Sequence, residues 1–339
     1  MNNVLALEQK IIPEMVELLS KRYQILKSIF YNQPVGRRMI SQELNMGERI
    51  VRSEVNFLKE QDLIEINSIG MVVTKEGEHI LESLQEVIHS INGLSIIEEK
   101  LAEYLGIAEV LVVPGDNDED KTVLKEMGRI AAGYIKGIIN DGSVIALTGG
   151  SSVSQAVESM PKVYKNNITV VPARGGMGSS VETQANTLVE KLAVKLNAKY
   201  KLLHVPDKIS HEAMDAMLNE PDIKEIASLI EKADILIFGL AKAKDMAVRR
   251  GLSDEKTSRL INKGAVGEAF GYYFNASGEI IYKTPCIGIS LNKVTNIDHV
   301  IAVAGGKSKA DAIMAAKIHN PHMVLITDEG AAKAILNIK

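Results

Sequence analysis

The sequence predicts an α/β fold in which an N-terminal winged helix-turn-helix domain precedes a larger, Rossmann-like domain built on an open parallel sheet. Two observations predict it. The first 90 residues show helical periodicity broken by tight turns, whereas from residue 110 short β-branched runs end in Gly or Pro and precede amphipathic helices. That alternation is typical of a parallel sheet covered on both faces. The 339 residues exceed one core, so we expect domains at 1–90 and 108–339 and a connector at 91–107.

The composition is that of a globular protein and excludes several classes. Hydrophobic residues make up 46% and charged residues 24%, which argues against a disordered chain or a coiled-coil rod. Trp is absent and aromatic residues total 4%, too few for stacking single-stranded bases. No apolar run approaches the roughly 18 residues of a membrane span, so we expect a cytoplasmic protein with no membrane partner. The lone Cys286 is expected to be a small buried hydrophobe, and no metal site is predicted.

Residues 23–74 have the pattern of a winged helix-turn-helix. The expected elements are a first helix around Tyr23, Leu26 and Phe30, a second over 37–44, a third over 48–61, and wing strands over 64–66 and 71–73. The third helix has an apolar face of Val51, Val55 and Leu58. Its opposite face is polar, as expected of a helix that enters the major groove of duplex DNA.

This module is basic although the whole chain has a net charge of −4. Residues 21–59 contain eight Lys and Arg against three acids, the local excess that release of counterions from DNA requires. The side chains expected to contact bases or phosphates are Arg37, Arg38, Arg49, Arg52, Ser53, Asn56 and Lys59. The alternative is a module for protein contacts with a solvated basic face.

An apolar stripe at helical spacing runs through residues 76–105 and is interrupted near Asn92 and Gly93. Two explanations are equally consistent with it. The stripe could pack against the second domain, or it could form the seam of a dimer. A homodimer or homotetramer is expected, because a single small reader module rarely gives useful specificity.

The second domain is expected to contain six buried strands, at 110–113, 144–147, 169–171, 235–238, 300–303 and 323–326. Glycine-rich or cationic turns follow several of them, at 148–152, 172–176, 249–250 and 305–310. The carboxyl ends of parallel strands share one edge, so these turns should converge on a crevice suited to a ligand with two anionic groups. Singly, each turn could equally be a tight turn with an N-cap serine or a solvated Arg pair.

Six stretches of the second domain resemble the sorbitol operon regulator (SorC) family of sugar-sensing transcription regulators. They are ALTGGSS (146–152), VPARGG (171–176), LNEPDIKEIASLIEKADILIFGL (218–240), GAVGEAFGYYF (264–274), VIAVAGGKSKADA (300–312) and MVLITDEGAAKAIL (323–336). Residues 36–65 resemble the winged-helix reader that some members carry. The resemblance implies an effector domain similar to sugar-phosphate isomerases and a repressor of glycolytic genes that binds double-stranded operator DNA. It implies no cofactor and a phosphorylated sugar as effector, fructose 1,6-bisphosphate above all.

The resemblance also implies an effector site, carried over residue by residue: Gly149, Gly150, Ser151, Ser152, Arg174, Gln184, Arg250, Glu268 and Lys309. The two serines and Lys309 would hold one phosphate, and Arg174 and Arg250 the second. Gln184 and Glu268 would bond sugar hydroxyls. Which of the adjacent arginines, Arg249 or Arg250, points inward is left open by the sequence.

The alternative function is an enzyme, a sugar-phosphate isomerase or a lactonase. The isomerases and lactonases that the second domain resembles need a His with carboxylates in one loop after a strand. Residues 239–246 match that loop in this chain and contain no His. None of the seven His adjoins the three Gly-rich turns. We therefore predict binding without chemistry and no catalytic residue.

Overall fold

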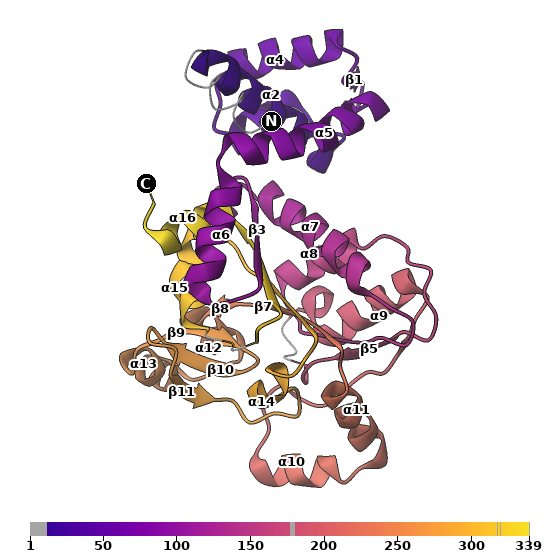
Figure 1. Cartoon of the computed structure of the whole chain (residues 1–339), viewed down its shortest axis with the longest axis vertical. Coiled ribbons are helices and arrows are strands. Elements are labelled where there is room, and N and C mark those ends of the chain that lie inside the picture. The colour runs from indigo at the N-terminus through magenta and orange to yellow at the C-terminus, as the bar shows by residue number, and fades with distance from the viewer. Residues whose placement is uncertain (1–11, 177–179, 317, 319, 339) are drawn as a thin grey trace. The chain divides into compact units, whose positions relative to one another are not determined.

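The computed structural model describes residues 12–176, 180–316, 318 and 320–338. The chain divides into two compact units. The first runs to Ile96 and takes in Asp120–Val123, and the second comprises Ile97–Glu119 and continues from Leu124. The predicted fold class is confirmed, since a small helical unit with a two-stranded wing precedes an α/β unit with a parallel sheet (Figure 1).

The first unit is a winged helix-turn-helix with the expected elements. They are α2 (Pro13–Asn32), α3 (Arg37–Glu43), α4 (Glu48–Glu60), β1 (Ile64–Asn67), β2 (Gly70–Val73) and α5 (Lys75–Ile91). The two strands pair antiparallel from Ile64 opposite Val73 to Asn67 opposite Gly70. The wing turn is closed by the Asn67 side chain, whose Oδ1 accepts the backbone N–H groups of Ile69 and Gly70.

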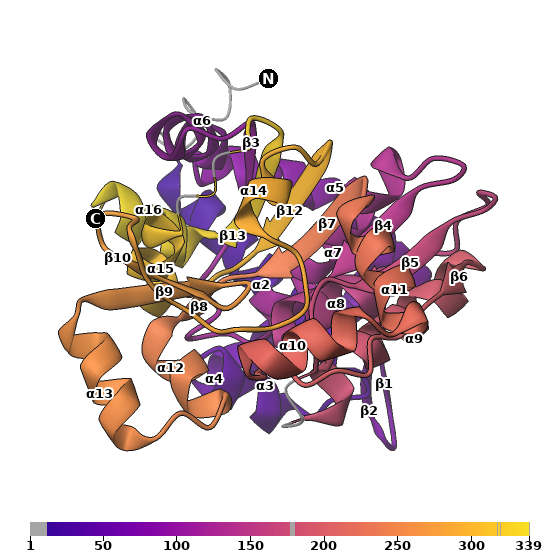
Figure 2. The same ribbon diagram turned by 90° about the horizontal axis from the view of Figure 1, so that it is seen from below.

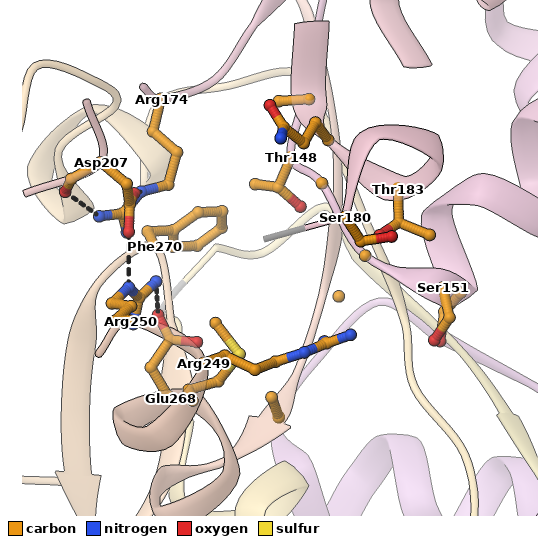
Figure 3. A pocket seen from close by; sticks show the side chains of 18 of the residues that line it. Thr148, Ser151, Arg174, Ser180, Thr183, Asp207, Arg249, Arg250, Glu268 and Phe270 are labelled. Atoms are coloured by element: carbon orange, nitrogen blue, oxygen red, sulfur yellow. Dashed lines mark hydrogen bonds and ion pairs between the residues drawn. The ribbon is translucent and has the colours of Figure 1, made fainter. Parts of the chain in front are cut away.

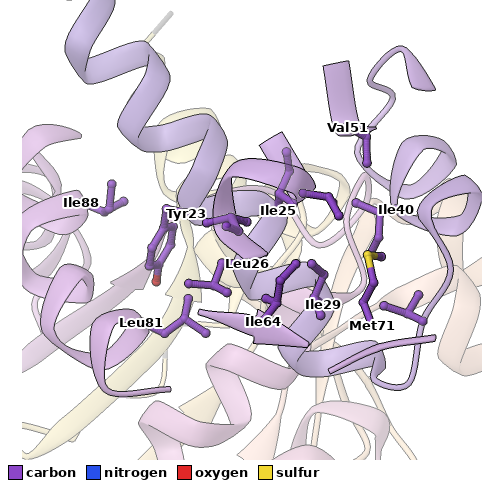
Figure 4. Close-up of a cluster of buried hydrophobic side chains, with 13 residues drawn as sticks. Tyr23, Ile25, Leu26, Ile29, Ile40, Val51, Ile64, Met71, Leu81 and Ile88 are labelled. Carbon is purple, nitrogen blue, oxygen red and sulfur yellow. The ribbon is translucent and has the colours of Figure 1, made fainter. Parts of the chain in front are cut away.

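One apolar core holds this unit together (Figure 4). Val51, Val55 and Leu58 of α4 are at most 2% exposed, as the period of the sequence predicts. Arg22 of α2 adds a polar clamp, since its Nε lies 2.8 Å from Glu54 Oε2 and its guanidinium carbon lies 3.4 Å from the centre of the Phe57 ring. The core face of α4 is therefore fixed, and its opposite face is presented outward.

The apolar stripe of residues 76–105 forms two helices, α5 and α6 (Leu94–Leu105). The break falls where the sequence predicts it, with Gly93 at φ +64°. Most of the stripe is used in packing, because Leu81, Ile88, Leu94 and Leu101 are buried.

The second unit is built on a seven-stranded parallel sheet (Figure 2). Its order is β3 (Glu109–Val113), β13 (Met323–Asp328), β12 (His299–Val303), β7 (Ile235–Gly239), β4 (Val144–Leu147), β5 (Thr169–Pro172) and β6 (Lys199–Tyr200). All six predicted strands are present. The sequence prediction missed β6, whose two residues are exposed and carry no apolar run.

The strand order creates a switch point between β4 and β7. The chain runs outward from β4 through β5 to β6, returns to β7, and then continues on the other side through β12 to β13. Connections that leave two neighbouring strands in opposite directions open a crevice above their carboxyl ends, which is where open α/β sheets bind ligands.

Helices and turns of this unit connect the strands. They are α7 (Thr122–Ile138), α8 (Ser151–Ser159), η1 (Val181–Thr183), α9 (Ala185–Leu196), α10 (His211–Leu218), α11 (Pro221–Glu231), α14 (Leu291–Val294), η2 (Lys307–Lys309), α15 (Ala310–Ala315) and α16 (Glu329–Leu336). Within the described residues, none of the helices has the length and apolar character that crossing a bilayer requires.

A second, antiparallel sheet lies between β7 and β12 in the sequence and was not predicted. Its strands are β8 (Ala241–Lys242), β9 (Ala265–Ala269), β10 (Tyr272–Asn275) and β11 (Ile280–Lys283), accompanied by α12 (Ala243–Arg249) and α13 (Asp254–Asn262). The sheet packs closely on α15, since a Cβ at Gly267 would lie 2.7 Å from the carbonyl oxygen of Ala312. Residues of this sheet thereby reach the crevice.

The packing of α5 on the wing depends on Gly77. A Cβ there would lie 2.1 Å from the carbonyl oxygen of Leu63, so we expect Gly77→Ala to destabilise the first unit by about 1–3 kcal/mol. Gly133→Ala is the control, because Gly133 lies exposed within α7 with no atom within 4 Å of its would-be Cβ. That change should stabilise the protein by roughly 0.5–1 kcal/mol. Thermal unfolding followed by circular dichroism measures both, and equal shifts would contradict the packing argument.

Candidate functional site

The outward face of α4 carries the predicted DNA-contacting side chains. Arg49, Arg52, Ser53 and Asn56 are exposed there, and Lys59 is exposed one turn further on. On α3, Arg37 and Arg38 are exposed as well, and Arg38 makes only a loose 3.7 Å pair with Glu48. All seven side chains are therefore available at the surface of the first unit.

Two apolar side chains on the same two helices were not predicted. Met39 is 56% exposed and Ile50 is 46% exposed. Their positions do not follow the core period of α3 or α4, and that departure was the signal available in the sequence. Apolar contacts of this kind suit the methyl group of thymine in the major groove.

The second candidate site is a cavity at the carboxyl ends of β4, β5 and β7 (Figure 3). All nine predicted effector residues line it: Gly149, Gly150, Ser151, Ser152, Arg174, Gln184, Arg250, Glu268 and Lys309. The sequence prediction omitted several further lining residues, among them Thr148, Asp207, Arg249 and Phe270. The strand order brings these distant segments together at the switch point.

One end of the cavity is the start of α8. Gly150 is the N-cap at φ +130°, and within the described structure no side chain caps the helix. Gly149 permits a close approach, since a Cβ there would lie 2.6 Å from the carbonyl oxygen of Thr183. Ser151 and Ser152 follow in the first turn, where the backbone N–H groups of a helix attract an anion.

Lys309 adds a cation beside this end. It is the last residue of η2, which comes after β12 in the chain. Burial lowers the pKa of its ammonium, while Asp118 and Asp328 oppose that effect. The turn before it is held by Asp328, whose carboxylate accepts backbone N–H groups from Gly306 at 2.6 Å and Asn117 at 2.8 Å. Burial raises the pKa of Asp328, and these hydrogen bonds oppose the rise. A bound phosphate would favour the charged form of Lys309.

The other side of the cavity is a buried network of two arginines and two carboxylates. Asp207 bridges the arginines: Oδ1 pairs with Arg174 Nε, and Oδ2 accepts from Arg250 Nε at 2.6 Å. Arg250 also donates from Nη2 to Glu268 Oε1 at 2.8 Å and from Nη1 to the Tyr273 hydroxyl at 3.0 Å. Burial alone would lower the pKa of Arg250, but Glu268 and Asp207 together raise it, so it stays charged. The four side chains carry two charges of each sign and neutralise one another.

This network changes the expected role of Arg250. Its side chain is only 3% exposed and its guanidinium is engaged by Asp207, Glu268 and Tyr273. Arg249, in contrast, is exposed and extends from α12 into the cavity, as Figure 3 shows. The structure thus answers which arginine points into the open cavity, because the last turn of α12 turns consecutive side chains in different directions.

The cavity has few groups suited to catalysis. No His is among the described residues that line it, and the two carboxylates of the network are held in ion pairs. In the described part of the chain, no cluster of three or more His, Cys, Asp or Glu is arranged to hold a metal. Cys286 is half-buried rather than fully buried: its Sγ accepts from Arg174 Nη2 at 3.2 Å, and burial raises the pKa of the thiol.

Two domain families match the chain. Residues 18–88 match the CggR N-terminal DNA binding domain, and residues 89–337 match a sugar-binding domain family. The first match covers α2 to α5 except their outermost residues, and the second covers the sheet and its cavity.

Named relatives agree with these matches. The chain is 44% identical to the central glycolytic genes regulator of Priestia megaterium and 40% identical to that of Bacillus subtilis, over 99% of each chain. A crystal structure of a SorC family transcriptional regulator from Enterococcus faecalis is similar at 38% identity and a TM-score of 0.66, over 71% of this chain and 99% of that one. The full-length sorbitol operon regulator of Klebsiella pneumoniae shares the fold over 95% of this chain and 98% of that one, with 20% identity and a TM-score of 0.65.

The enzyme alternative is set aside, because these relatives are transcription regulators and the chain carries their DNA-binding domain. The two family matches also give the order of the domains, with the DNA-binding domain before the sugar-binding domain. The chain belongs to the SorC family of transcription regulators, with a DNA-binding domain followed by a sugar-binding domain.

Proposed function

We propose that the protein represses glycolytic genes and that fructose 1,6-bisphosphate is the sugar phosphate that modulates its binding to operator DNA. The observation that carries the proposal is a cavity lined by several anion-attracting groups: the start of α8, the ammonium of Lys309 and the guanidinium of Arg249. A ligand with two phosphates would satisfy more of these groups than a ligand with one. The names of the relatives support the choice of genes.

The first phosphate is expected at Ser151 and Ser152, where helix N–H groups, hydroxyls and the Lys309 ammonium converge. Glu268 and Gln184 line the same cavity and are suited to sugar hydroxyls. These assignments are the ones that the family resemblance implies.

The second phosphate is expected at Arg249 rather than at Arg250. A phosphate that drew Arg250 out of the network would leave Asp207 and Glu268 without this partner in a buried site. Breaking a buried ion pair costs about 3–5 kcal/mol. Arg174 is held by Asp207 in the same way. Arg249 carries no such cost, since it makes no ion pair that the described residues reveal.

Duplex DNA is the proposed partner of the first unit. We expect α4 to enter the major groove, with Arg49, Arg52 and Asn56 at base edges and Lys59 nearer the phosphates. A homodimer or homotetramer would place two such helices on half-sites about one helical turn apart. Repression of this kind would take place in the cytoplasm, and residues 1–90, 91–107 and 108–339 are the proposed reader, connector and effector segments.

Arg52→Ala is expected to weaken binding to an operator selected from random duplexes by the parent protein. A bidentate contact to a base discriminates by roughly 1–3 kcal/mol, so operator affinity should fall about tenfold or more while affinity for scrambled DNA changes little. Fluorescence anisotropy at fixed salt measures both. Lys263→Ala, which removes an exposed cation from the second unit, is the control. Equal operator affinity of Arg52→Ala and the parent would mean that Arg52 does not contact a base.

Arg249→Ala is expected to weaken fructose 1,6-bisphosphate about tenfold or more, because a charged hydrogen bond contributes about 1.5–3 kcal/mol. Fructose 6-phosphate, which has one phosphate, should be much less affected, whereas Lys309→Ala should weaken both ligands. Lys244→Ala is the matched control, since Lys244 is exposed on the same helix but does not line the cavity. Calorimetric titration gives the affinities, and a loss that is the same for both ligands would place the second phosphate elsewhere.

Ligand and operator are expected to be linked thermodynamically. A sugar phosphate can change DNA affinity only if it favours one arrangement of the protein over another, and a coupling of about 1–3 kcal/mol is typical of such switches. Operator DNA must then weaken sugar binding by the same factor by which the sugar weakens operator binding. Titration of fructose 1,6-bisphosphate with and without saturating operator measures this factor. Identical affinities in the two titrations would mean that the sugar does not regulate DNA binding.

A further inference from the structure

The turn between β9 and β10 holds a bulky residue in a conformation that bulky residues avoid. Phe270 has φ +52° and Gly271 has φ +82°, so both central residues of this two-residue hairpin turn are left-handed. Such turns strongly prefer Asn-Gly or Asp-Gly. A Phe in the left-handed region costs of order 1–3 kcal/mol and persists only where the surroundings impose it.

The surroundings that impose it are the charged groups of the cavity wall. The backbone N–H of Gly271 donates to Glu268 Oε1 at 2.6 Å, and that same oxygen accepts from Arg250. Arg174 packs against Gly271 so closely that a Cβ there would lie 2.4 Å from Nη1. On the other side, the carbonyl of Gly271 accepts the backbone N–H of Thr284 at 2.9 Å. The turn is thus clamped between the ion-pair network and the next strand.

The clamped turn directs the ring of Phe270 to the cavity (Figure 3). The ring packs on Phe238 of β7, with 4.5 Å between centroids and 40° between planes. Among the described residues that line the cavity, Phe270 provides the only aromatic ring. Most of the other side chains that line the cavity are polar or charged, and the ring adds apolar surface to this wall.

We propose that Phe270 is a specificity-determining residue that packs against the C–H face of the bound sugar phosphate, and that the strained turn is retained because it places this ring. The inference rests on the proposed function. A sugar has an apolar C–H face besides its hydroxyls and phosphates, and a flat ring in a mostly polar cavity is suited to that face. The helix start, Lys309 and Arg249 would recognise phosphates alone, whereas the ring would recognise the carbon skeleton that joins them.

The competing explanation is that Phe270 only fills space beside Phe238. Two substitutions separate the explanations. Phe270→Leu keeps an apolar side chain of similar reach but removes the flat ring. Phe270→Asn removes the ring and supplies the residue that this turn prefers, so relief of backbone strain offsets part of the packing that is lost.

The test is calorimetric titration of the full-length protein with fructose 1,6-bisphosphate and with inorganic pyrophosphate, which has two phosphates and no carbon skeleton. We expect both variants to bind the sugar about tenfold more weakly than the parent and to bind pyrophosphate as the parent does. Circular dichroism checks that each variant is folded.

Three results would overturn the inference. One is Phe270→Leu with the parent's affinity for the sugar. Another is an equal loss for sugar and pyrophosphate, which would mean that the ring only shapes the wall. A parent protein that binds no sugar phosphate at all would refute the proposed function itself, and is distinguished from the other two because it is seen before any substitution is made.

Discussion

The cavity at the switch point depends on one buried carboxylate, Asp207. Asp207 accepts from Arg174 and Arg250 at once, and it lies in a segment between β6 and α10 that has no regular structure of its own. Two guanidinium groups at such proximity would repel each other in a poorly solvated site. With Asp207 between them and Glu268 beyond, the charges balance and both arginines become rigid parts of the wall. The strained turn at Phe270 rests on this wall through Glu268 and Gly271.

The two sides of the cavity therefore differ in whether their charged groups already have partners. On one side, α8 begins without a side-chain cap within the described structure, and Lys309 stands beside it on a turn that Asp328 anchors. The backbone N–H groups at the start of α8 and the Lys309 ammonium can therefore bind an anion. On the other side the charges of the network are already satisfied, whereas Arg249 extends into the open space. A ligand with two phosphates and a carbon skeleton would meet a helix start, a ring and an exposed cation in one cavity.

Periodicity predicted most helices and strands because the positions that are buried in the fold carry apolar residues in the sequence. Val51, Val55 and Leu58 follow a helical period, and all three lie in the core of the first unit. The six apolar runs of the second domain are strands for the same reason. Prediction failed at β6, which has two exposed residues, and at the antiparallel sheet, where β8 has two residues and β9 and β11 include Gly267, Glu268 and Lys283. Asp207 follows no motif, so no local signal identified it.

The sequence by itself determined the two-part organisation, the exposed basic face of α4 and the glycine-rich turns after β4, β5 and β12, because each is a property of a contiguous segment. Only the tertiary structure decided which charges meet. The adjacent residues Arg249 and Arg250 are the same in kind, yet one lies in the cavity and the other in a buried network. The buried position of Arg250 depends on partners 18 and 43 positions away along the chain, Glu268 and Asp207. The tertiary fold brings these residues together, and the local sequence around Arg250 gives no sign of them.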